Sequence, residues 1–119
     1  MHKVLIVDDA TFMRVSLKNI LERNGFQVIG EAENGIAAIK KCAELKPDII
    51  TLDITMPEMD GLTALKEIKR VHSDVKVVMV SAMGQEPFVR DAVISGARDF
   101  IVKPFSEELI VKTMNNLCK

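Results

Sequence analysis

The chain alternates five short apolar runs with five longer amphipathic stretches, and this alternation limits the folds that it can adopt. The runs are Val4–Val7, Phe26–Ile29, Ile49–Leu52, Val77–Val80 and Phe100–Val102. Most of them lack the polar alternation of a half-exposed strand, which indicates strands covered on both faces. We therefore predict five parallel strands separated by helices.

The stretches between the runs carry apolar residues at helical spacing and are bounded by residues that start or stop helices. Residues suited to a helix start precede three of them: Asp60, Pro87 and Ser106. Residues suited to a helix stop follow three: Asn24-Gly25, Pro47 and Gly96. Each amphipathic stretch is therefore expected to form one helix.

Alternation of this kind predicts an α/β fold, because crossovers between parallel strands are right-handed and cover both faces of the sheet with helices. The expected architecture is a doubly wound (βα)5 three-layer sandwich around a parallel five-stranded sheet. The chain of 119 residues has the size of one domain and contains no repeats or linkers. We predict a single domain that spans residues 1–119.

Charge and cysteine content exclude several classes of function. The formal net charge is -1, so no global field favours nucleic acid or an anionic membrane, and we expect neither as a partner. Cys42 and Cys118 are too few and too far apart for a disulfide or metal framework, and they fit thiols in a reducing compartment. The apolar run that follows Met1 is too short for a signal peptide, so we expect a cytoplasmic protein.

Polar residues follow four of the five apolar runs. In sheets of this class, binding sites form beyond the carboxyl ends of the strands. The residues at those positions are Asp8-Asp9, Asp53, Ser81 and Lys103. Each of them alone is explained by a helix cap, a turn or a solvated charge. Their convergence on one edge of one sheet is harder to explain in that way, and it predicts a functional site.

The chemistry of these side chains suits a phosphoryl group. Three carboxylates and one ammonium leave a local charge of about -2, and hard oxygen ligands of this kind suit Mg²⁺. The ion and Lys103 could neutralise a phosphoryl group brought to Asp53, which would be the nucleophile and form an acyl phosphate. Ser81 would donate a hydrogen bond to a phosphoryl oxygen.

The same residues resemble the motifs of response regulator receiver domains from two-component systems. The matching segments are Val7-Asp8-Asp9, Leu52-Asp53, Met56–Gly61, Ser81-Ala82 and Val102–Phe105. The resemblance covers essentially the whole chain and is strongest to stand-alone chemotaxis members of the family. It implies a flavodoxin-like fold with strand order 2-1-3-4-5, no output domain and a monomeric state.

The resemblance also implies a role for each site residue. Asp53 would accept a phosphoryl group from a histidine kinase. The Mg²⁺ ligands would be Asp8, Asp9, Asp53 and the backbone carbonyl of Thr55. The phosphoryl-binding groups would be Ser81, the backbone of Ala82, and Lys103, whose bond to Pro104 resembles one that is cis in the family.

The family's switch would couple Ser81 to Phe100 and alter an output face formed by the fourth helix, fifth strand and fifth helix. Here that face would include Arg90, Ile94, Phe100 and Val102. The implied target is a flagellar motor switch protein, with a chemotaxis kinase upstream and a phosphatase as a further partner. Such a protein catalyses only its own phosphotransfer and dephosphorylation, so we do not expect an enzyme in the usual sense.

Other functions stay open at this stage. The chain could be a phosphorelay intermediate that passes phosphate to a histidine phosphotransferase, or the receiver of a DNA-binding regulator. An aspartate-dependent phosphatase is disfavoured, because those enzymes need a second Asp as general acid where this chain has Thr55. A flavin-binding module is weaker still, since the chain has no Trp or Tyr to stack on the ring.

Overall fold

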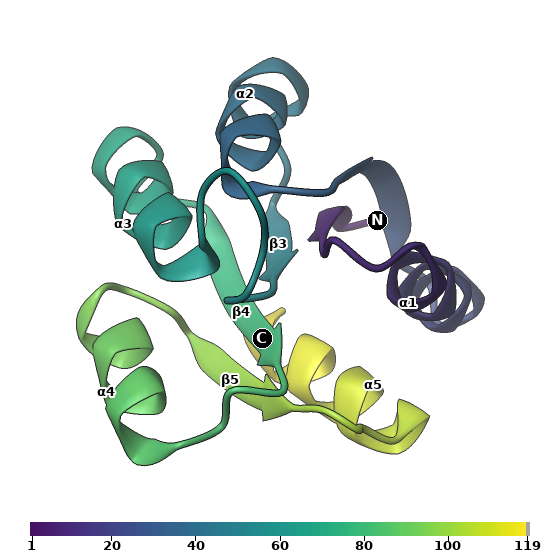
Figure 1. Ribbon diagram of the computed structural model, residues 1–119. Coiled ribbons are helices and arrows are strands. Elements are labelled where there is room, and N and C mark those ends of the chain that lie inside the picture. Colours follow the sequence, from purple (N-terminus) through teal and green to yellow (C-terminus); the bar gives the residue numbers. More distant parts are fainter. Residues whose placement is uncertain (119) are drawn as a thin grey trace.

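A computed structural model describes residues 1–118, in which five strands and five helices alternate along the chain (Figure 1). The strands are β1 (Lys3–Val7), β2 (Gln27–Ala32), β3 (Ile49–Leu52), β4 (Lys76–Ser81) and β5 (Asp99–Val102). The helices are α1 (Thr11–Arg23), α2 (Gly35–Leu45), α3 (Gly61–Val71), α4 (Glu86–Ile94) and α5 (Glu107–Leu117). The strands form one parallel sheet in the order β2-β1-β3-β4-β5, which confirms the predicted fold class and strand order.

Helices cover both faces of the sheet, with α1 and α5 on one side and α2, α3 and α4 on the other (Figure 1). Strand β1 shows the resulting alternation. Its Val4 and Ile6 belong to the core beneath α1 and α5, whereas Leu5 and Val7 belong to the core beneath α2, α3 and α4. All four side chains are buried, so apolar residues occupy successive positions of the strand.

Strand β3 is the centre of the sheet and carries one polar residue into the core. Thr51 is 2% exposed and pairs with Ile6 on one side and Val78 on the other. Its Oγ1 is the only buried side-chain polar atom that lacks a hydrogen-bond partner within residues 1–118. A buried hydroxyl that lacks a hydrogen bond costs free energy relative to one that is bonded.

The helix boundaries follow local signals that the sequence contains. As predicted, Asp60 and Ser106 are N-caps, and they accept hydrogen bonds from the backbone N–H groups of Thr63 and Leu109. Two predicted boundaries differ slightly. Pro87 is the second residue of α4, not the first, and α2 ends one residue before a left-handed Lys46 (φ +51°) and not directly at Pro47.

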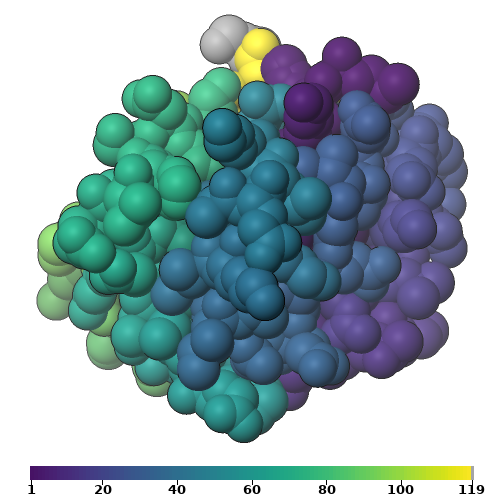
Figure 2. Space-filling view, turned by 90° about the horizontal axis from the view of Figure 1, so that it is seen from above, coloured from purple at the N-terminus to yellow at the C-terminus, as the bar shows by residue number. Residues whose placement is uncertain are grey.

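The first residues of the chain and the end of α5 lie at the amino end of the sheet. Met1 and His2 precede β1, and the Lys76 ammonium at the start of β4 donates a 2.7 Å hydrogen bond to the Leu117 carbonyl at the end of α5. Figure 2 shows the first residues of the chain next to the last helix at this end. No helix in the described part of the chain is both long and apolar enough to cross a bilayer.

Candidate functional site

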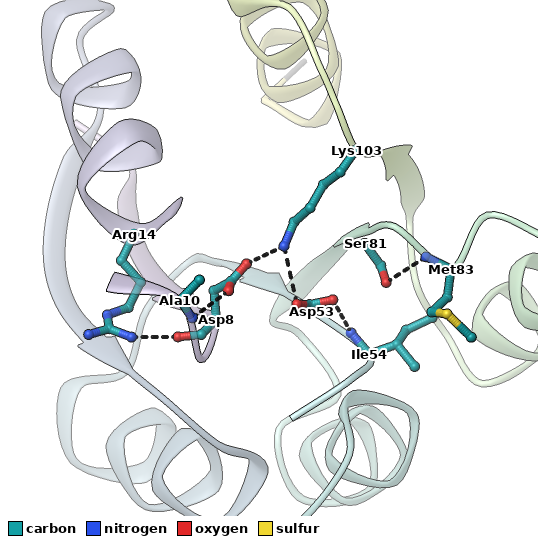
Figure 3. A network of polar contacts seen from close by, with 8 residues as sticks. All are labelled: Asp8, Ala10, Arg14, Asp53, Ile54, Ser81, Met83 and Lys103. Atoms are coloured by element: carbon teal, nitrogen blue, oxygen red, sulfur yellow. Dashed lines mark hydrogen bonds and ion pairs between the residues drawn. The ribbon is translucent and has the colours of Figure 1, made fainter. Parts of the chain in front are cut away.

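The carboxyl ends of the strands bring the predicted site residues together. Val7 and Leu52 are paired in neighbouring strands, so Asp8 and Asp53, which follow them, emerge side by side. Lys103 follows β5 and reaches across to both carboxylates (Figure 3). Asp8 and Asp53 are 1% and 6% exposed, which is unusually low for carboxylates.

Lys103 is the cation of this site. Its Nζ lies 2.6 Å from Asp8 Oδ2 and 3.1 Å from Asp53 Oδ2. Burial alone lowers the pKa of Lys103, but the hydrogen bonds to Asp8 and Asp53 and their charges outweigh burial and raise it above its usual value. Lys103 is therefore held charged between two buried carboxylates.

Backbone N–H groups fix the other oxygen of each carboxylate. Asp8 Oδ1 accepts a 2.9 Å hydrogen bond from the Ala10 N–H, and Asp53 Oδ1 accepts one of 2.7 Å from the Ile54 N–H (Figure 3). Each aspartate thus has one oxygen bound to the loop that follows it and one oxygen directed at Lys103. The two side chains are oriented before any ligand arrives.

A third carboxylate completes the cluster. Asp9 is exposed, and ligand oxygens of Asp8, Asp9 and Asp53 all lie within 4.8 Å of one another. Three carboxylates against one ammonium give a net charge of -2, and oxygen atoms at this spacing fit a hard divalent cation such as Mg²⁺. Thr55, the predicted backbone ligand, is exposed in the loop that follows Asp53 and Ile54.

The loop between β3 and α3 folds back tightly on the strand end. The Gly61 N–H donates a 2.7 Å hydrogen bond to the Ile54 carbonyl, and a Cβ at Gly61 would lie 1.8 Å from the Asp53 carbonyl oxygen. No side chain fits in that space, so glycine is required at position 61. This close approach holds the backbone of Asp53 and the loop that carries Thr55.

Ser81 lies at the end of β4 with its hydroxyl directed at the next loop. The side chain is fully buried, and its Oγ accepts a 3.1 Å hydrogen bond from the Met83 N–H (Figure 3). Ala82 beside it is exposed. Further along this loop, a Cβ at Gly84 would lie 2.7 Å from a methyl group of Val102. The loop after Ser81 is thus packed against β5.

The remaining predicted residues lie on α4 and β5 and after β5. Arg90 on α4 is exposed and forms an ion pair with Glu86, and Ile94 is 77% exposed. On β5, Val102 is 45% exposed, whereas Phe100 is half-buried against the core beneath α2, α3 and α4. The Lys103–Pro104 peptide bond is cis. The use of this surface as an output face stays a prediction.

Sequence reasoning missed one residue of the site. Arg14 on α1 donates a 2.7 Å hydrogen bond from Nη1 to the Asp8 carbonyl (Figure 3). Its Nε donates a 3.0 Å hydrogen bond to Glu31 Oε1. An arginine in the first turns of an amphipathic helix is usually solvated, so the pattern alone gave no reason to choose it. Its position six residues after Asp8, on the helix that starts from the same loop, was the available signal.

Comparisons with known proteins agree with this arrangement. A family model described as response regulator receiver domain matches residues 4–115. The chain is 55% identical to the chemotaxis protein CheY of Bacillus subtilis, over 96% of this chain and 95% of that protein. It is 52% identical to CheY of Thermotoga maritima, over 98% of both chains. A crystal structure of a CheX–CheY–BeF3–Mg²⁺ complex from Borrelia burgdorferi is similar, with a TM-score of 0.97, 39% identity and coverage of 99% of this chain and 90% of that one.

Proposed function

The chain belongs to the response regulator receiver domain family, and from this membership we propose that it is a switch activated by phosphorylation of Asp53. CheY-like receiver domains of two-component systems are signalling switches and not classical enzymes. The phosphoryl donor would be a phosphohistidine on a histidine kinase. The identity with CheY over nearly the full chain supports a place in chemotaxis.

One observation carries this proposal. The Lys103 ammonium lies within 3.1 Å of an oxygen of both Asp8 and Asp53, and the carboxylate of Asp9 belongs to the same cluster. Burying like charges together is unfavourable, and such clusters are typical of places where a ligand or a reaction uses the charges. A phosphoryl acceptor with a metal site beside it accounts for every charge in the cluster.

The reaction follows from the orientation of Asp53. With Oδ1 bound by the Ile54 N–H, Oδ2, which contacts Lys103, would be the oxygen that attacks the donor. A lone pair of Oδ2 attacks phosphorus, the O–P bond forms, and the P–N bond breaks with its electron pair returning to the imidazole. A bound Mg²⁺ would add positive charge beside the phosphoryl oxygens. Lys103 then exchanges one of its carboxylate contacts for a phosphoryl oxygen.

The ligands of that ion would be the carboxylates of Asp8, Asp9 and Asp53 and the carbonyl of Thr55. The Ser81 hydroxyl and the Ala82 N–H would bind the remaining phosphoryl oxygens. Ser81 would release the Met83 N–H in doing so, which frees the loop packed on Val102 and lets Phe100 move inward. Arg90, Ile94, Phe100 and Val102 would then present a changed surface to the target.

The proposed target is a flagellar motor switch protein, and the proposed kinase is that of the chemotaxis pathway. The complex of CheX with CheY supports the expectation that a protein related to CheX also binds this chain. A phosphorelay, in which Asp53 passes phosphate to a histidine phosphotransferase, uses the same site and differs only in the partner.

Acetyl phosphate with Mg²⁺ tests the phosphoacceptor. Intact-mass spectrometry is expected to detect one added phosphoryl group that is lost on alkaline treatment, as for an acyl phosphate, and Asp53→Asn is expected to abolish it. The exposed Asp74, at the opposite end of the sheet, supplies the matched control Asp74→Asn, which should be labelled like the unmodified chain. Equal labelling of the Asp53→Asn variant would show that another residue accepts the phosphoryl group.

A further inference from the structure

Other elements hold the backbone on both sides of the Asp8 α-carbon. The Asp8 N–H donates a 3.0 Å hydrogen bond to the Ala32 carbonyl of β2, which ties the residue to the neighbouring strand. The Asp8 carbonyl accepts the 2.7 Å hydrogen bond from Arg14 Nη1. Because the peptide bond is planar, fixing this carbonyl also fixes the direction in which the chain enters Asp9.

Asp9 has no comparable support of its own. No hydrogen bond to its carboxylate occurs within residues 1–118, and the residue is exposed. Asp8 and Asp53, in contrast, each have both oxygens bound. The place of Asp9 in the carboxylate cluster therefore depends on the backbone that precedes it.

Arg14 is built into the fold as a rigid anchor for that backbone. Its side chain is only 14% exposed, and its guanidinium contacts the Asp8 carbonyl, Glu31 and Thr11. Glu31 is held in turn, since its own carbonyl accepts a hydrogen bond from the Lys41 ammonium of α2. A hollow of about 350 Å³, lined in part by Arg14, Glu31 and Lys41, lies beside this network.

We infer that Arg14 is a positioning residue that sets the Asp9 carboxylate for metal binding by fixing the Asp8–Asp9 peptide. The inference rests on the proposed metal site of Asp8, Asp9 and Asp53. Arg14 makes no hydrogen bond to any of the three carboxylates, so it acts through the backbone. A guanidinium can hold the carbonyl and Glu31 at once with its fixed planar fork, whereas an ammonium cannot reproduce that geometry.

Titration with Mg²⁺ alone, followed by calorimetry, tests this role on the full chain. Groups that orient metal ligands from outside the ligand set typically contribute about 10–100-fold to metal affinity, so Arg14→Met is expected to raise the Kd for Mg²⁺ about tenfold. Methionine keeps the aliphatic stem of Arg14 and so limits loss of packing. Arg14→Lys keeps the charge and is expected to bind Mg²⁺ as weakly as Arg14→Met.

Two controls make the outcome decisive. Lys18→Met removes a cation one turn further along α1 without touching the Asp8 carbonyl or Glu31, and its Kd should be unchanged. Asp9→Asn removes a proposed ligand and should weaken binding; if it does not, the metal site itself is wrong. If Asp9→Asn weakens binding and Arg14→Met does not, only the role of Arg14 is wrong. Normal Mg²⁺ affinity in Arg14→Lys would also overturn the role of Arg14, because its charge alone would then be sufficient.

The NMR resonance of the Asp9 amide separates positioning from a general loss of stability. It should shift in Arg14→Met at temperatures at which this variant is fully folded.

Discussion

The two ends of the sheet treat charged residues in opposite ways. At the amino end, Lys3 and Asp48 are exposed, and Asp48 accepts a 2.8 Å hydrogen bond from the Lys3 backbone N–H. Lys76 lies beside them and is bonded to a backbone carbonyl. At the carboxyl end, two nearly buried aspartates bind the ammonium of Lys103, and a third carboxylate, that of Asp9, lies within 4.8 Å of theirs.

The comparison distinguishes charged groups that stabilise the fold from charged groups whose burial destabilises it. Those at the amino end satisfy backbone groups, as strand ends require. Those at the carboxyl end bring like charges out of water, which destabilises the folded state, and such a cost is typical of functional sites. Cavity size does not identify the end of the sheet that carries the candidate site. A hollow of about 380 Å³ lies at the amino end, and none of the site residues lines it.

The largest expected effect comes from removing the Lys103 ammonium at the carboxyl end, compared with removing the Lys76 ammonium at the amino end. Lys103→Met leaves two buried carboxylates without their partner and, without Mg²⁺, should lower the free energy of unfolding by roughly 3 kcal/mol. The matched variant Lys76→Met loses one hydrogen bond from an ammonium to a carbonyl, which is worth about 1.5 kcal/mol. Urea unfolding of both variants measures the difference.

Added Mg²⁺ sharpens this test. The ion should restore part of the stability of Lys103→Met, because it supplies positive charge to the same carboxylates, and it should leave Lys76→Met unchanged. Equal losses in the two variants, with no effect of the ion, would contradict the contrast between the ends.

A smaller effect is expected between the two ends, at Thr51. Its buried hydroxyl has no partner among the described residues, so Thr51→Val should raise the free energy of unfolding by about 1 kcal/mol. Phosphorylation by acetyl phosphate should be unaffected, since the change removes a polar group that the site does not use. A loss of stability in thermal or urea unfolding would mean that the hydroxyl has a partner, such as a buried water.

The smallest effect is expected at an exposed ion pair that links α1 to α5. Glu107 accepts hydrogen bonds from Arg23 and Asn24, and these bonds with the charge of Arg23 lower the pKa of Glu107 to about 2. Because the folded pKa lies below the unfolded one, the pair stabilises the fold above about pH 4.3 and loses its effect as the pH falls towards 2.

Carboxyl resonances followed by NMR would give this pKa directly. Glu107→Gln should destabilise the protein slightly at neutral pH and less in acid, and added salt should weaken the effect further. A Glu107 pKa near its usual value would show that the pair does not persist in solution.

The sequence was sufficient for the fold because several local signals agree. Apolar runs, caps at Asp60 and Ser106, and left-handed stops at Gly25 and Gly96 each follow from short-range physics. The meeting of Asp8, Asp53 and Lys103 followed from parallel strands that end together. The hydrogen bonds of Arg14 and the Ser81–Met83 contact did not, because they depend on side-chain directions that residue spacing does not encode.

The position of the termini has a practical consequence. Met1 and the end of α5 both lie at the amino end of the sheet, a full strand length from Asp53. A tag, a fluorophore or a sensor surface can therefore be attached before Met1 or after α5 while Asp53, the proposed phosphoacceptor, and the loops around it stay open to partners. Immobilised in this way, the protein presents the same edge to every binding partner, and kinetics measured on the tethered chain should match those in free solution.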